Sequence, residues 1–237
     1  KGLPKNFVTN FRQVDDCKAS VDGKELLVSS SAGAIAVVSY PAGKTVFYAH
    51  VPNAHSIETL PDGLVVAASS TNVEGNKLMF FDRAQPDKVL TTLPLKAAHG
   101  VLYDPGRKVL WALEDDVLLE LSVTRRGDDV EVNEELRYPL GVKGGHDLQM
   151  MHDGSKLIVS TSGRVMMFDI AKETFAPYAP LVGLKNVKSV SINPTTGQLA
   201  YTQADPKVWW TFTVRFMQPD ATATLDSETY KVRWSER

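Results

Sequence analysis

The sequence contains a single cysteine, Cys17, so no disulfide can form within the chain. It also lacks a run of about 18 consecutive apolar residues, which excludes a membrane-spanning helix of ordinary length. Neither sign of charge is in excess, because 26 Lys and Arg residues face 28 Asp and Glu residues, for a net charge of −2. Without a basic surplus to neutralise phosphates, we expect no nucleic-acid partner.

The compartment is left open by these features. A single cysteine is compatible with a cytosolic protein and with a secreted one. The sequence starts at Lys1, without a Met and without a recognisable signal peptide. We therefore expect a secreted or periplasmic protein if an N-terminal signal has been removed, and we expect it to be a monomer.

Apolar residues make up 43% of the chain, enough for a packed core, and they are arranged in a repeat. Each copy starts with a polar residue and a short strand, followed by a Gly-containing turn and two further apolar strands. The clearest copies begin at His55 and at His146. In both copies an Asp-Gly pair, Asp62-Gly63 or Asp153-Gly154, follows at the same spacing.

Three weaker copies complete the series. One begins at His99 and turns at Asp104-Pro105-Gly106, and another is inferred from Asp22-Gly23, which points back to Asp15. The last begins at Lys188 and turns before Gly197. We call the first residues of the copies the anchors: Asp15, His55, His99, His146 and Lys188. Successive anchors are 40, 44, 47 and 42 residues apart, and one further step of about 45 residues ends close to Arg237.

Each copy continues with runs rich in β-branched and apolar residues, which predict three more strands. Predicted second strands are 26–28, 64–66, 109–111, 157–159 and 199–201. Predicted third strands are 34–39, 77–81, 117–121, 164–168 and 208–214. Predicted outer strands are 45–49, 89–93, 132–138, 175–178 and 230–234. The second and third strands are almost continuously apolar, which is typical of sheets buried on both faces, whereas the outer strands alternate.

Four-stranded units of this period predict an all-β fold, a five-bladed β-propeller of four-stranded antiparallel blades. We expect one domain over residues 1–237, with blades at approximately 15–52, 53–96, 97–142, 143–184 and 185–237. Four blades would need about 60 residues each, and six would need fewer than about 40. The main alternative is a larger propeller whose other blades lie outside this sequence.

The pattern of a small residue, His, a small residue, an apolar residue and then Asp-Gly resembles the inner strand of NHL-type propellers. Among these it is similar to the streptogramin lyases and the peptidyl-amidating lyases. The chain also resembles uncharacterised secreted propellers of bacteria. In the lyase families, a His at this place in several blades faces the channel and binds or surrounds a metal. The resemblance therefore implies a metal near His55, His99 and His146.

The inner strands of a propeller converge on its axis, so the anchors should face one another across a channel. His55, His99 and His146, with Asp15 as a possible fourth ligand, form a set suited to Zn²⁺ or a similar divalent metal. The alternative is that these side chains only hydrogen-bond backbone groups and the ordered water of the channel. Both interpretations stay open at this stage.

Lys188 complicates the metal hypothesis, because its positive charge opposes a cation beside it. It could instead hold an anionic substrate, pair with Asp15, or act as a catalytic base if burial lowers its pKa. Loops after the second strands should open on the same face as the anchors, and Glu114 and Arg164 add charges there. We therefore predict Asp15, Lys188, Glu114 and Arg164 as ligand-binding residues.

The predicted function is binding of a small-molecule or carbohydrate ligand, polar or glycan-derived, or of a protein partner, at the top face of the channel. The alternative is a metal-dependent lyase or hydrolase that uses the histidines. For Trp209-Trp210 we expect one ring to pack between blades and the other to be exposed, with a core role favoured over a sugar-stacking one. Cys17 aligns with Ile57 and Leu148 in other copies, which predicts a buried residue.

Overall fold

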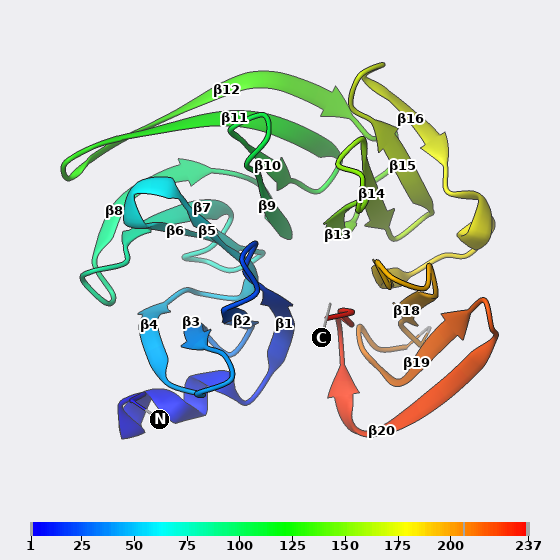
Figure 1. Ribbon diagram of the computed structural model, residues 1–237, viewed down its shortest axis with the longest axis horizontal. Helices are drawn as coiled ribbons and strands as arrows, with labels where there is room; N and C mark the ends of the chain where they lie inside the picture. The colour runs from blue at the N-terminus through cyan, green and yellow to red at the C-terminus, as the bar shows by residue number, and fades with distance from the viewer. Residues whose placement is uncertain (1, 206, 236–237) are drawn as a thin grey trace. The chain divides into compact units, whose positions relative to one another are not determined.

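The computed structural model describes residues 2–205 and 207–235 and has the predicted fold, a five-bladed β-propeller of four-stranded antiparallel blades (Figure 1). Residues 1, 206, 236 and 237, which belong to the predicted domain, lie outside the described part of the chain. In every blade the strands are hydrogen-bonded in the order in which they follow one another along the chain. Each blade is therefore a simple antiparallel meander.

The chain divides into two compact units. The first comprises Lys1–Glu114 and Leu118–Arg137, and the second comprises Asp115–Val117 and Tyr138–Arg237. The first unit holds the first two blades and most of the third, and the second unit holds the fourth and fifth blades. The two units are described separately below.

The first unit contains twelve strands in three blades. The first blade consists of β1 (Val14–Ala19), β2 (Glu25–Ser30), β3 (Ala34–Ser39) and β4 (Thr45–His50). The second consists of β5 (Ala54–Leu60), β6 (Leu64–Ser69), β7 (Lys77–Asp82) and β8 (Val89–Pro94). The third consists of β9 (Gly100–Asp104), β10 (Val109–Leu113), β11 (Val117–Arg126) and β12 (Asp129–Pro139), whose end residues belong to the second unit.

The second unit contains the remaining eight strands. The fourth blade consists of β13 (Gly145–Met150), β14 (Lys156–Thr161), β15 (Val165–Asp169) and β16 (Thr174–Pro177). The fifth consists of β17 (Val187–Ile192), β18 (Leu199–Gln203), β19 (Thr211–Met217) and β20 (Ala221–Thr229). The three described helical segments, η1 (Lys5–Phe11), η2 (Pro61–Gly63) and η3 (Ala179–Leu181), are short 3₁₀ turns. None of the helices within residues 2–205 and 207–235 could cross a bilayer.

The near-continuous apolar runs form the middle strands, as predicted. All six residues of β6 are buried, whereas β4 alternates along its length. In the first unit, Ile57 of β5 joins Leu27, Phe47 and Phe81 in one core cluster that links the first two blades. In the second unit, Val190 and Leu199 join residues of the fourth blade in a second cluster.

The Asp-Gly pairs make the predicted turns. Asp62 and Gly63 both have a positive φ, 59° and 70°, in the tight connection between β5 and β6. Asp and Gly are suited to this left-handed conformation, Gly because it has no Cβ and Asp because its side chain can hydrogen-bond locally. The spacing from anchor to turn therefore records the length of each inner strand.

Two predictions about the chain were wrong. The outer strand of the fifth blade is β20, not Tyr230–Trp234, because Pro219-Asp220 turns the chain five residues after the predicted end of the third strand. Residues 230–235 follow β20 instead as a tail beside β17. The backbone N–H of Val232 donates to Ser189 at 2.9 Å, and that of Trp234 donates to Ser191 at 2.8 Å.

Cys17 is the second correction, since it is exposed rather than buried. Its counterpart Ile57 is fully buried in the cluster with the preceding blade. β1 is the first strand of the first unit, so no earlier blade of that unit covers the equivalent side of Cys17.

Candidate functional site

The anchors occupy a common structural position, a β-bulge at the start of the inner strand. In four blades the pairing of the first two strands skips one residue, and that residue is the anchor: Asp15, His55, His146 and Lys188. A bulge leaves one residue unpaired and turns its side chain away from the regular alternation. In the third blade His99 precedes β9, and its backbone N–H donates to the carbonyl of Leu113 at 3.0 Å.

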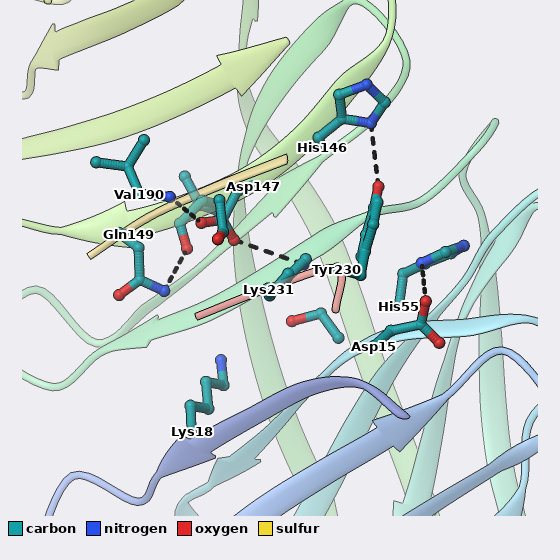
Figure 2. Close-up of polar contacts among 12 residues, drawn as sticks. Asp15, Lys18, His55, His146, Asp147, Gln149, Val190, Tyr230 and Lys231 are labelled. Carbon is teal, nitrogen blue, oxygen red and sulfur yellow. Dashed lines mark hydrogen bonds and ion pairs between the residues drawn. The ribbon is translucent and has the colours of Figure 1, made fainter. Parts of the chain in front are cut away.

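In the first unit the structure brings together three anchors. Nδ1 of His55 lies 3.4 Å from Oδ1 of Asp15, and Figure 2 shows the carboxylate directed at this ring. The rings of His55 and His99 are stacked, with centroids 4.4 Å apart and planes 18° apart. Nδ1 of His99 lies 2.7 Å from the carbonyl oxygen of Ala97, so this nitrogen carries a proton and donates it.

The loops after the second strands support these anchors. The backbone N–H of Ser31, just after β2, donates to Oδ2 of Asp15. Ser70, just after β6, has its hydroxyl oxygen 3.2 Å from Nδ1 of His99. These loops were predicted to lie on the face of the anchors, and in both blades a residue of the loop contacts an anchor directly.

Two of the predicted metal ligands, His55 and His99, have stacked rings in the first unit. A metal ion lies in the plane of each imidazole that binds it, and two stacked parallel rings have no such point in common. Within residues 2–205 and 207–235 no group of three His, Cys, Asp or Glu side chains is arranged to hold a metal ion. A metal bound by His55 and His99 would require one ring to leave the stack. Metal binding by the predicted ligands, which are His55, His99, His146 and Asp15, stays a prediction.

In the second unit two anchors contact each other directly. Nζ of Lys188 lies 2.7 Å from Nε2 of His146. The hydroxyl of Tyr230 lies 3.1 Å from Nδ1 of the same ring, as Figure 2 shows. An ammonium group can only donate, so Nε2 of His146 accepts and Nδ1 carries the proton. His146 therefore donates from Nδ1 to the oxygen of Tyr230. The lone pair of Nε2 that a metal would need faces the ammonium of Lys188.

Lys188 is the buried cation of this group. The residue is 7% exposed, and burial lowers the pKa of its amine from 10.5 to about 8. Its Nζ lies 6.0 Å from the centre of the Tyr230 ring. No carboxylate of residues 2–205 or 207–235 lies within ion-pair distance of Lys188, whose partners there are the neutral His146 and the Tyr230 ring.

A glycine makes the His146 contact possible. Gly144 has a φ of +77°, and a Cβ at this position would lie 2.2 Å from the hydroxyl oxygen of Ser162. Because that space is empty, Ser162 approaches closely, and its hydroxyl lies 3.0 Å from Nε2 of His146. Ser162 follows β14, at the same place in its blade as Ser70 in the second blade.

A second charged cluster holds the tail beside this site. Asp147, which follows His146, accepts two hydrogen bonds from the guanidinium of Arg233 at 2.8 and 2.6 Å. It also accepts the backbone N–H of Val190 at 3.1 Å, and Nζ of Lys231 lies 3.5 Å from it. Figure 2 shows Lys231 and Val190 directed at this carboxylate. The cluster joins the fourth blade, the fifth blade and the tail, and so positions Tyr230 against His146.

The two remaining predicted ligand-binding residues are engaged elsewhere. Oε2 of Glu114 lies 3.5 Å from Arg137 on the outer strand β12. Arg164 donates to the carbonyl oxygen of Leu140 at 2.9 Å. The ligand-binding role of Glu114 and Arg164 therefore stays a prediction.

Sequence reasoning missed Tyr230, Asp147 and the position of Trp209. Trp209 is 43% exposed, and its ring meets the ring of Tyr230 at 5.6 Å and 69°. One exposed ring was expected in the Trp pair, and Trp209 is that ring, whereas Trp210 is half-buried. The turn at Pro219-Asp220 was the available signal, because it ends the last blade before Tyr230 and leaves the tail for another role.

Comparison with known proteins adds one finding. A family described as a family of unknown function (DUF6528) matches residues 3–236 of the chain. No curated protein matches it.

Proposed function

The chain belongs to the DUF6528 family, whose function is unknown, and from its own geometry we propose that it binds a small polar ligand carrying a carboxylate or phosphate. Lys188 supplies the positive charge, and His146 and Tyr230 hold it in position. The observation that carries this proposal is a buried ammonium group whose partners in the described chain are neutral.

The electrostatic argument is simple. Transfer of an ammonium group from water into a protein interior is costly unless an opposite charge compensates it. His146 compensates with one hydrogen bond and no net charge. A ligand carboxylate or phosphate would add a charge-assisted hydrogen bond, which is about twice as strong as a neutral one. Ligand binding therefore offers the stabilisation that the folded chain itself lacks at Lys188.

The test uses sodium phosphate and sodium acetate as probes at constant ionic strength, with binding followed by calorimetry and by the midpoint of thermal unfolding. We expect at least one of these anions to raise the midpoint of the wild-type protein at pH 7. Lys188→Met should remove the effect. The matched control is Lys172→Met, because the Lys172 side chain is 76% exposed in the same unit. Equal responses of both variants to the anions would refute the proposal.

A second candidate function is catalysis with Lys188 as a general base. The lowered pKa, about 8, favours it, because a base is most effective when its pKa is close to the working pH. The sequence resemblance to the streptogramin and peptidyl-amidating lyases also supports a lyase. In this reaction the neutral amine of Lys188 would take a proton from a substrate carbon, while the bond from the neighbouring carbon to a leaving group breaks and that group departs with the electron pair. The candidate predicts a rate that rises with pH through about 8 and is lost in Lys188→Met.

A further inference from the structure

An exposed aromatic patch lies directly beside the Lys188 site. Trp209, Trp210 and Phe212 form this aromatic patch, at the start of β19 and just before it. Trp209 is 43% exposed and Phe212 is 44% exposed. Trp210 and Phe212 meet edge to face, with ring centroids 4.9 Å apart. Large aromatic side chains gathered at a surface are a common sign of a ligand-binding site.

The aromatic patch is continuous with the buried cation through Tyr230. The ring of Trp209 contacts the ring of Tyr230 at 5.6 Å, and Nζ of Lys188 lies 6.0 Å from that same Tyr230 ring. The hydroxyl of Tyr230 in turn contacts His146. The Tyr230 ring, which is 4% exposed, therefore links the exposed Trp209 to the ammonium group.

We propose that the ligand is an acidic carbohydrate, whose pyranose ring stacks on Trp209 while its carboxylate binds Lys188. This inference rests on the proposed anion site and names its substrate class. A sugar acid combines the required features in one molecule. The C–H face of its ring is apolar and suits an indole, its hydroxyl groups suit the hydroxyls of Ser162 and Tyr230, and its carboxylate suits the ammonium.

The polar surroundings favour a sugar acid over a purely apolar carboxylic acid. An aromatic or aliphatic acid offers no hydroxyl groups to those of Ser162 and Tyr230, both of which also contact His146. A neutral sugar would leave the buried ammonium without a counter-charge. Polar groups left unpaired on binding are the main source of discrimination between similar ligands.

The experiment compares four probes on the full chain at pH 7 by calorimetry and saturation-transfer NMR. Glucuronate has a pyranose ring and a carboxylate, gluconate has the carboxylate on an open chain, glucose has only the ring, and benzoate has a flat apolar ring with a carboxylate. We expect glucuronate to bind at least ten-fold more tightly than each of the other three. We also expect the strongest saturation transfer at its ring C–H protons.

Two variants separate the parts of the site. Trp209→Ala should reduce the affinity for glucuronate to that for gluconate, with gluconate binding unchanged. Leu225→Ala is the matched control, because Leu225 is 37% exposed on β20 of the same blade and lies outside the aromatic patch, and it should keep the preference. Trp209→Phe retains an aromatic ring and should keep most of the preference for glucuronate. This variant shows whether a loss in Trp209→Ala comes from the missing ring or from misfolding.

The possible outcomes are distinct. Equal binding of glucuronate and gluconate by the wild-type protein would overturn the stacking role of Trp209 while leaving the anion site intact. Tighter binding of benzoate would overturn the carbohydrate class. Binding of glucose as tight as that of glucuronate, or no binding of any probe, would overturn this inference and count against the anion site as well.

Discussion

Nζ of Lys188 lies 2.7 Å from Nε2 of His146, and this contact determines the protonation of both side chains. The ammonium can only donate, so the imidazole is neutral and carries its proton on Nδ1, toward Tyr230. The two residues are 42 positions apart and occupy the same bulge in neighbouring blades. The repeat therefore places two equivalent positions in contact but gives them different roles, one as cation and one as acceptor.

The buried charge of Lys188 should make stability depend on pH. Its pKa is about 8 in the folded protein and 10.5 as a free side chain, so between these values the unfolded chain binds more protons. Stability of the wild-type protein should therefore rise with pH across this window, relative to Lys188→Met. At pH 7 without ligand, the variant should be more stable by at most about 3 kcal/mol. Urea unfolding from pH 7 to 10.5 measures this.

Lys172→Met is again the control for the pH experiment. Its exposed side chain should leave the pH dependence unchanged. A constant difference between wild type and Lys188→Met over the whole window would show that the amine of Lys188 titrates normally.

The tail should be held by Asp147. Asp147→Asn leaves Arg233 and Lys231 buried beside a neutral amide, and breaking a buried ion pair in this way costs about 3–5 kcal/mol. We expect the variant to unfold at correspondingly lower urea concentration and to be cut more readily by trypsin in the tail. Asp22→Asn, which removes an exposed partner of Lys24, should change stability little. Resistance of the Asp147 variant to trypsin equal to that of the wild type would contradict the role of this cluster.

Gly144 should tolerate no larger residue. Gly144→Ala combines a strained positive φ with a Cβ placed 2.2 Å from the hydroxyl oxygen of Ser162, and we expect a loss of about 2–3 kcal/mol. Gly154→Ala has a similar φ of +67° with nothing within 4 Å, so it should lose only about 1–2 kcal/mol. The double variant Gly144→Ala with Ser162→Gly should recover part of the difference in urea unfolding. Equal losses of unfolding free energy in the two single alanine variants would show that Ser162 moves away from the new Cβ without destabilising the protein.

The predicted metal set can be tested by zinc titration of protein prepared without a His-tag. Because the stacked rings of His55 and His99 must separate before both can bind one ion, we expect any Zn²⁺ binding to be weak. It should disappear in His99→Ala. Stoichiometric binding that survives this substitution would show that the ion sits elsewhere.

The repeat made most of the fold predictable. Apolar runs between Asp-Gly turns predicted the middle strands, and Ala34–Ser39 forms β3 with the predicted bounds. The fifth blade was harder, because its last hairpin turns at Pro219-Asp220 and the next run, Tyr230–Trp234, is also apolar. A short apolar run has the same pattern whether it forms an edge strand or a tail packed on an inner strand.

The sequence by itself determined the blades and the five anchors, because both follow from local patterns that repeat every 40 to 47 residues. Only the tertiary structure decided which anchors contact each other and which further residues join them. Tyr230 is 84 positions from His146, and Arg233 is 86 positions from Asp147. Such contacts depend on how the blades and the tail pack, so the spacing of the sequence repeat does not predict them. The burial that lowers the pKa of Lys188 has the same origin, since it arises from neighbouring elements rather than from the residues beside it in sequence.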